Sequence, residues 1–109
     1  MVADITPRIR VPATASPGEI IEIRALVSHP METGDRIGAD GLKVPRNIIN
    51  RFVCTYNGQT VFSADWHVAV SANPYVGFHV RASRTGEILM SWTEDDGSVH
   101  VAGAHMEVS

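Results

Sequence analysis

Apolar and polar residues alternate one by one along most of this chain of 109 residues, and this period of two constrains the fold more than any other feature. A β-strand places successive side chains on opposite faces, so an alternating segment predicts a strand with one face buried. Such segments cover residues 21–28, 51–56, 61–66, 76–82, 88–93 and 99–108. No stretch has convincing helical periodicity, and the pattern therefore predicts an all-β protein.

Turn residues separate the alternating segments. Asn57-Gly58 is a strong signal for a tight hairpin, and Thr85-Gly86 and Asp96-Gly97 mark two further turns. The segment between Pro7 and Pro12 is expected to be an edge strand, because proline donates no hydrogen bond to a neighbouring strand. About seven short strands at this spacing predict an immunoglobulin-like antiparallel β-sandwich.

The last alternating segment changes its apolar parity. Val99 and Val101 are odd-numbered, whereas Met106 and Val108 are even-numbered. A β-bulge inserts one extra residue and would produce such a switch, and glycine tolerates the bulge backbone. The sequence therefore predicts a bulge at Gly103.

Length and composition limit the functions that the chain could have. Its length suits a single domain over residues 1–109, with residues 1–6 as a flexible N-terminal tail. Nine Lys and Arg against twelve Asp and Glu give a net charge of -3, which does not suit nucleic-acid binding. One cysteine, Cys54, excludes an intramolecular disulfide and a thiolate zinc cluster. The sequence shows neither a membrane span nor a signal peptide, which alone would indicate a cytoplasmic protein.

Motifs of catalysis are missing from the sequence. Ser63, Asp65 and His67 are close together, but they share one face of one predicted strand, whereas a catalytic triad needs groups that converge from separate segments. The acidic run at residues 94–97 lacks the spacing of a calcium loop and is better explained as a solvated hairpin tip. No catalytic residue and no cofactor is expected.

Five histidines and one cysteine in a β-sandwich resemble, in composition, the iron centre of superoxide reductases. Such centres take the cysteine and a histidine from one short loop, whereas Cys54 is expected in mid-strand and its nearest histidine, His67, is a strand away. Ligand spacing rather than ligand count indicates a metal site, so no metal is expected and a superoxide-reductase-type protein stays an alternative. Cys54, between Phe52 and Tyr56, is expected to be a small buried hydrophobic residue.

One long irregular segment, residues 29–47, interrupts the strand pattern, and we call it the long segment. Loops longer than about 15 residues in a compact domain are usually functional or disordered. It holds Met31 and Val44, and it leads into Ile48 and Ile49, which could equally begin the next strand and cap the core. The residues expected to bind a partner are His29, Met31, Glu32, Arg46, Ile48 and Tyr75. A local ion pair between Glu32 and Arg46 is an alternative for those two side chains.

Several motifs, taken in order, are more specific than composition. They are His29–Gly34, Pro45–Asn50 leading into Phe52–Cys54, Phe62–Asp65, Ala72–Tyr75 and Trp92–Ser98. With these motifs the chain resembles the SoxZ family of sulfur-oxidation proteins, from about Arg8 to the C-terminus.

The resemblance implies a sandwich without catalytic activity that pairs with SoxY and, through it, serves other sulfur-oxidation enzymes. The SoxY arm carries a cysteine on which sulfur substrates such as thiosulfate are bound covalently, and this chain has no such arm. The resemblance also implies a periplasmic location, because SoxZ is exported while bound to SoxY. A subunit of this kind is expected to self-associate when isolated. A generic adhesion or chaperone-like sandwich is a further alternative that no specific residue favours.

Overall fold

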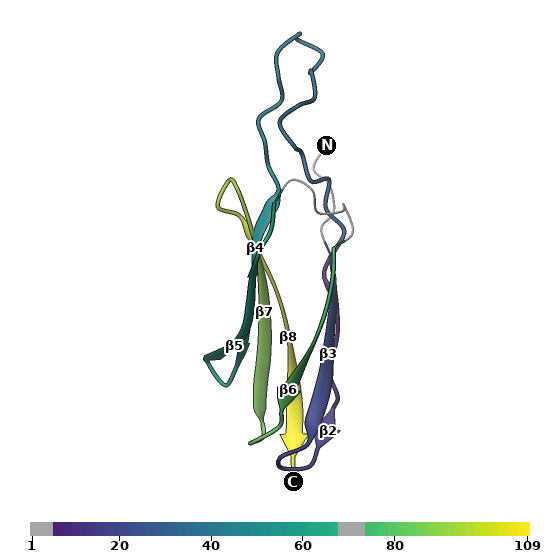
Figure 1. The fold of residues 1–109 in the computed structure, drawn as a ribbon, viewed down its shortest axis with the longest axis vertical. Helices are drawn as coiled ribbons and strands as arrows, with labels where there is room; N and C mark the ends of the chain where they lie inside the picture. Colours follow the sequence, from purple (N-terminus) through teal and green to yellow (C-terminus); the bar gives the residue numbers. More distant parts are fainter. Residues whose placement is uncertain (1–5, 68–73) are drawn as a thin grey trace.

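Every regular element in the described residues, 6–67 and 74–109 of the computed structural model, is a β-strand (Figure 1). The strands are β1 (Arg8–Arg10), β2 (Thr14–Ala15), β3 (Ile20–Leu26), β4 (Ile49–Tyr56), β5 (Gln59–Asp65), β6 (Tyr75–Arg81), β7 (Gly86–Glu94) and β8 (Val99–Val108). No helix in this described part is long and apolar enough to cross a membrane.

The strands form two sheets that face each other. The smaller sheet has the order β1-β3-β6, and the larger has the order β2-β8-β7-β4-β5. The chain crosses between the sheets from β3 to β4, from β5 to β6 and from β6 to β7, so neither sheet is made only of consecutive strands. This confirms the predicted immunoglobulin-like β-sandwich.

The start of the chain departs from the predicted pattern. β1 pairs only with β3 and lies at an edge, as the prolines predicted. The chain then changes sheet, and Thr14–Ala15 forms β2, which pairs with β8 in parallel. The described residues therefore form eight strands rather than about seven, and one pairing of the sandwich is not antiparallel.

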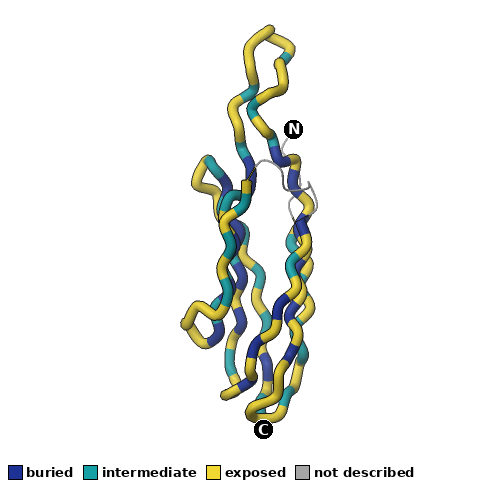
Figure 2. Tube along the Cα trace, in the orientation of Figure 1, coloured by how far each residue is buried: buried dark blue, intermediate teal, exposed yellow. Residues whose placement is uncertain are grey.

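The core lies between the sheets. Buried and exposed residues alternate along the strands, most clearly in β3, as the period of two predicted (Figure 2). Phe52 lies at the centre, where its ring centroid is 5.2 Å from that of Trp92 and 6.2 Å from that of Phe78. Each fully buried side chain of this size contributes about 1.5–3 kcal/mol by leaving water.

The hairpin between β4 and β5 forms as predicted. Asn57 and Gly58 both have positive φ, 50° and 82°, which is typical of the tight type I′ turn. The Asn57 side chain also crosses to β7, where its Oδ1 accepts a hydrogen bond from the Glu87 amide at 3.0 Å. A Cβ at Gly86 would lie 1.6 Å from that oxygen, so a side chain there would displace Asn57 from this contact.

The predicted bulge at Gly103 is wrong. β8 pairs with β7 in one continuous register, from Gly86 opposite Met106 to Thr93 opposite Val99. The even-numbered residues of β8 face inward along its length, and Val99 and Val101 face outward, 53% and 61% exposed. The apolar parity changes because apolar side chains occupy opposite faces at the two ends of one regular strand.

The long segment extends beyond the sandwich as two adjacent legs (Figure 1). Glu32 pairs with Asn47 near its base, and Ile37 pairs with Lys43 near its tip. The Val44 amide donates to the Arg36 carbonyl at 2.8 Å between these two bridges. The segment is therefore a hairpin-like ladder. Of the predicted tail, only Thr6 lies in the described part of the chain, and Ala72 and Asn73 of the fourth motif lie outside it.

Candidate functional site

Three of the residues predicted to bind a partner are buried by the chain itself. Met31 and Ile48 belong to the hydrophobic core, and His29 is buried beside them at the base of the long segment. Met31 has a positive φ of 50°, and its sulfur accepts a hydrogen bond from the Ile49 amide at 3.3 Å. Met31 and Ile48 could therefore influence a partner only through the backbone that they hold in place, whereas His29 also lines the cavity described below.

The other three candidates are more accessible. Glu32 is partly buried and pairs with Arg36 at 2.7 Å, whereas Arg46 pairs with Asp95 at 2.8 Å. The alternative of a Glu32–Arg46 ion pair is therefore wrong, because each side chain has a nearer partner of opposite charge. Tyr75 begins β6 on the smaller sheet, so it does not join the candidates of the long segment. Partner binding by any of the six residues stays a prediction.

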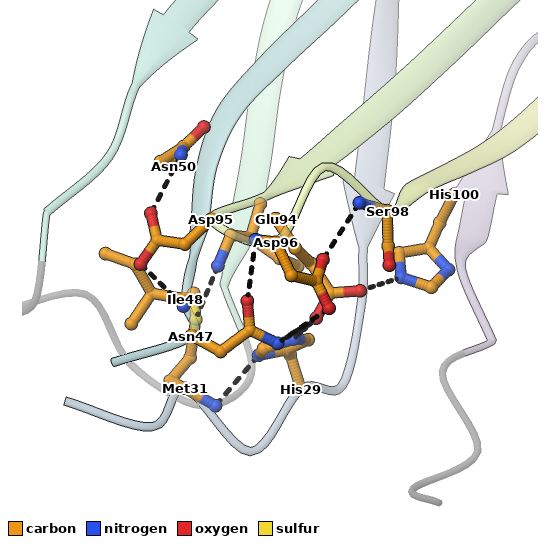
Figure 3. Close-up of polar contacts among 11 residues, drawn as sticks. His29, Met31, Asn47, Ile48, Asn50, Glu94, Asp95, Asp96, Ser98 and His100 are labelled. Atoms are coloured by element: carbon orange, nitrogen blue, oxygen red, sulfur yellow. Dashed lines mark hydrogen bonds and ion pairs between the residues drawn. The ribbon is translucent and has the colours of Figure 1, made fainter. Parts of the chain in front are cut away.

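A buried carboxylate lies where the long segment meets the sandwich (Figure 3). Glu94 lies at the end of β7. Its Oε1 is hydrogen-bonded to His29 Nε2 at 2.6 Å, and its Oε2 is hydrogen-bonded to His100 Nε2 at 2.5 Å. Asn47 Nδ2 donates to Oε1 at 2.9 Å. Burial works to raise the pKa of Glu94, but the hydrogen bonds from His29 and His100 outweigh it and hold that pKa below its ordinary value. Glu94 is therefore a charged group with hydrogen bonds to both of its oxygens.

The backbone determines which nitrogen of His29 carries the proton. Met31 N–H donates to His29 Nδ1 at 2.8 Å, so Nδ1 must be the unprotonated nitrogen. Nε2 then carries the hydrogen and donates to Glu94. A hydrogen on Nδ1 would leave the buried Met31 amide without its acceptor. The loop geometry therefore requires the tautomer of His29 that carries its hydrogen on Nε2.

Asp95 forms a second polar centre beside Glu94. Its two oxygens accept hydrogen bonds from Arg46 Nε and Nη2 at 2.8 and 3.1 Å, which is a bidentate contact. Asn50 Nδ2 and the Ile48 amide donate to the same carboxylate at 2.9 and 3.2 Å. Burial works to raise the pKa of Asp95, but the donors of Asn50, Arg46 and Ile48 lower it overall. The predicted hairpin tip forms, with Asp96 and Gly97 exposed, but Glu94 and Asp95 are acceptors that fix the base of the long segment.

A cavity of about 460 Å³ opens between the long segment and the β7–β8 turn. His29, Glu94 and His100 form part of its wall, and Val44 and Pro45 add apolar surface. The polar groups that reach this wall already bind one another, as described for Glu94. The arrangement provides a shaped surface of polar and apolar side chains.

The described residues, 6–67 and 74–109, contain no group of three or more His, Cys, Asp or Glu side chains arranged to hold a metal ion. Cys54 is fully buried in β4, and burial raises the pKa of its thiol to about 11. The expectation that Cys54 is a small buried hydrophobic residue is confirmed. A thiol of this kind is almost entirely protonated near neutral pH, and it has no access to solvent.

The middle of the larger sheet presents an uncharged outer surface that the sequence pattern did not predict. Val53, Leu89, Val99 and Val101 face outward from β4, β7 and β8, and we call this surface the apolar outer face. Ser91 lies opposite both Val53 and Val101 in the register, so the middle of the face has no charge. The signal was the pair Val99 and Val101, which the predicted bulge assigned to the core.

The family model described as "Sulphur oxidation protein SoxZ" matches residues 9–105, nearly the whole chain. A search of curated proteins found no match.

Solved structures resemble the fold. A structure of superoxide reductase (neelaredoxin) from Ignicoccus hospitalis superposes with a TM-score of 0.67 at 17% sequence identity, covering 95% of this chain and 80% of that one. The CARDB domain of the PF1109 protein from Pyrococcus furiosus, in complex with di-metal ions, superposes with a TM-score of 0.58 at 16% identity, covering 97% and 88%. At such identities the likeness shows the shared sandwich and nothing about metal or chemistry.

Proposed function

Because the chain belongs to the SoxZ family of sulfur-oxidation proteins, we propose that it is the non-catalytic subunit of a heterodimeric sulfur carrier and pairs with SoxY. In this proposal SoxY supplies the arm whose cysteine holds the sulfur substrate covalently, and this chain supports that arm. The observation that carries the proposal is the family match over residues 9–105.

The state of Cys54 supports this division of labour. A sulfur carrier needs a thiolate that solvent and other enzymes can reach, because the thiolate is the reactive form. Cys54 is 0% exposed, and its pKa is about 11, so it meets neither requirement. It is also the only cysteine in the sequence. We therefore assign the carrier thiol to another chain.

The apolar outer face is the surface that we assign to SoxY. Permanent partners bury uncharged, apolar surface at the centre of their interface, whereas charged residues are depleted there. Leu89 and Val101 are 46% and 61% exposed without a partner, and a shallow hollow of about 230 Å³ lies between them and Val53. Covering this face with a second sandwich would remove these side chains from water.

The test is titration calorimetry of purified SoxY into the chain and into two variants. Leu89→Glu and Val101→Glu each place a charge in the middle of the apolar outer face, and we expect either to weaken SoxY binding at least ~100-fold. Ile20→Glu is the matched control, since Ile20 is similarly exposed but lies on the smaller sheet. Unchanged affinity in both variants would mean that SoxY binds elsewhere. Failure of the unaltered chain to bind SoxY would contradict the pairing itself.

We also propose that the chain reaches the periplasm only together with SoxY. A chain that depends on its partner for export should remain in the cytoplasmic fraction when SoxY is deleted or lacks its export signal. Fractionation of host cells with and without SoxY, followed by immunoblotting of this chain, measures the distribution. Periplasmic recovery in the absence of SoxY would contradict co-export.

A further inference from the structure

The smaller sheet has an outer surface of opposite character to the apolar outer face. The side chains that alternate outward from its three strands include Arg8 and Arg10 of β1, Arg24 of β3 and Arg81 of β6. These are four of the nine basic residues in a chain whose net charge is -3. We call this surface the basic face. Leu26 and Tyr75 lie in the same row as Arg8, and Glu22 and His79 separate Arg81 from the other three arginines.

Two of these arginines lie side by side on neighbouring strands. Arg10 lies directly opposite Arg24 in the antiparallel pairing of β1 with β3. Like charges at such positions are destabilising. Glu22 offsets only one of them, through its hydrogen bond to Arg24 at 2.7 Å. Within the described residues, 6–67 and 74–109, neither Arg8 nor Arg10 has an acidic partner.

Tyr75 lies among these charges. It is opposite Leu26, which is itself opposite Arg8, so the three residues form one row across the sheet. A Cβ on Gly77 would lie 3.2 Å from the Tyr75 hydroxyl oxygen, so the missing side chain at position 77 leaves room for the ring along the strand. The ring and Leu26 border a shallow hollow of about 200 Å³ with Arg8, Arg10 and Arg24 around it. Tyr75 is 60% exposed there.

We propose that the basic face docks the acidic surface of another protein in a transient encounter. Arginine and tyrosine are among the residue types that dominate binding energy at protein interfaces. An array of exposed guanidinium groups on an acidic molecule selects an approaching negative surface and speeds its association. The identity of that protein rests on the proposed function: it is an enzyme that acts on the sulfur carried by SoxY, which must bind and leave in each cycle.

The surface itself can be tested without any sulfur enzyme. Poly-L-glutamate serves as the acidic probe, and the double variant Arg8→Gln, Arg10→Gln is compared with Arg51→Gln, Arg84→Gln. Both doubles remove two exposed arginines, but Arg51 and Arg84 lie off the basic face. We expect the unaltered chain and the control to bind the probe at low salt, and the Arg8 and Arg10 double to lose at least ~10-fold in affinity. Equal loss in both doubles would overturn the proposal, and so would binding of inorganic sulfate with no binding of poly-L-glutamate.

The functional arm uses the SoxYZ heterodimer in a reconstituted thiosulfate-oxidation assay at varied ionic strength. The Arg8 and Arg10 double should lower the rate at limiting enzyme ~10-fold at low salt and flatten its salt dependence, while SoxY affinity and thermal stability stay unchanged. If SoxY affinity falls instead, the acidic partner is SoxY and the transient-encounter proposal is wrong. If the unaltered chain fails to bind SoxY, the proposed function is wrong. The poly-L-glutamate experiment still shows whether the basic face binds acidic polypeptides.

Discussion

Glu94 is the residue on which the base of the long segment depends. Its carboxylate accepts hydrogen bonds from His29 and Asn47, at the two ends of the long segment, and from His100 of β8. Hydrogen bonds to a charged group contribute about 1.5–3 kcal/mol each when they are buried. The loss of this one charge therefore affects the core, the loop and β8 together.

Glu94→Gln should lower the free energy of unfolding by about 1–3 kcal/mol at pH 7. The variant replaces one carboxylate oxygen by an NH₂ group, which would then face a histidine N–H, so two donors would meet without an acceptor. Urea titration followed by tryptophan fluorescence measures the change. Glu22→Gln, at an exposed position, is the control and should change stability by less than about 0.5 kcal/mol. Equal stability of the Glu94 variant and the unaltered chain would contradict the role assigned to this carboxylate.

The same residue makes a prediction about pH. The pKa of Glu94 in the folded chain lies below its ordinary value of 4.5, so the charged carboxylate stabilises the fold above that pH. This contribution is lost as the pH falls through the lowered pKa. Glu94→Gln lacks it at every pH, so the difference in stability from the unaltered chain should narrow in acid. A constant difference between pH 7 and pH 3 would contradict this reasoning.

Cys54 should be inert in the folded protein. With a pKa of about 11, only about one thiol in ten thousand is ionised at pH 7, and the side chain is buried. Iodoacetamide should label it at least ~100-fold faster after unfolding in guanidinium, as measured by mass spectrometry. Rapid labelling of the folded chain, or a stable sulfur adduct on Cys54, would contradict the assignment of the carrier thiol to SoxY.

At the scale of the structural element, the long segment has two parts. Its base belongs to the hydrophobic core, and its tip does not. Met31 at the base is buried, whereas Ile37 and Leu42 near the tip are exposed. A replacement that began at Met31 would therefore remove core as well as loop. The boundary lies at the bridge between Glu32 and Asn47.

Replacing residues 35–44 with a short Gly-Ser turn should leave the fold intact, because loop-closure entropy changes slowly with length. Far-UV dichroism should be native-like, while SoxY binding or the reconstituted thiosulfate assay should be impaired if the tip takes part in recognition. Met31→Ala, in contrast, should cost about 2–5 kcal/mol of stability. Full binding and activity of the shortened chain would show that the tip has no functional role.

At the scale of the whole molecule, two opposed surfaces differ in chemistry. The apolar outer face has no charge at its centre, and the basic face gathers arginines on an acidic chain. The molecule, with the long segment included, has extents of 59 × 23 × 19 Å, and the two faces belong to different sheets. One subunit could therefore hold a permanent partner on one side and receive a transient one on the other.

The isolated chain should self-associate through the apolar outer face, because exposed apolar patches promote association. Sedimentation velocity over a range of concentrations should show a dimer or larger species, which Val101→Glu converts to a monomer. Adding SoxY should replace the self-association with a heterodimer. A chain that stays monomeric at all concentrations would contradict the role of this face.

The sequence alone determined the class of fold, most of the strands and the hairpin at Asn57-Gly58. Side-chain period and turn chemistry are local properties, so they survive without knowledge of the partner strands. The buried state of Cys54 followed from the same alternation. The recognisable motifs also pointed to the family that the comparison confirmed.

Only the tertiary structure determined which residues of distant segments lie opposite one another. Val99 and Val101 are apolar whichever way they face, and the register with β7 is what places them outside. Arg46 pairs with Asp95, which is distant in sequence, because the β7–β8 turn comes to the base of the long segment. The basic face likewise exists only because β1, β3 and β6 are neighbours in one sheet. Pairing between distant segments is set by how the two sheets close over one core, and no local pattern contains that information.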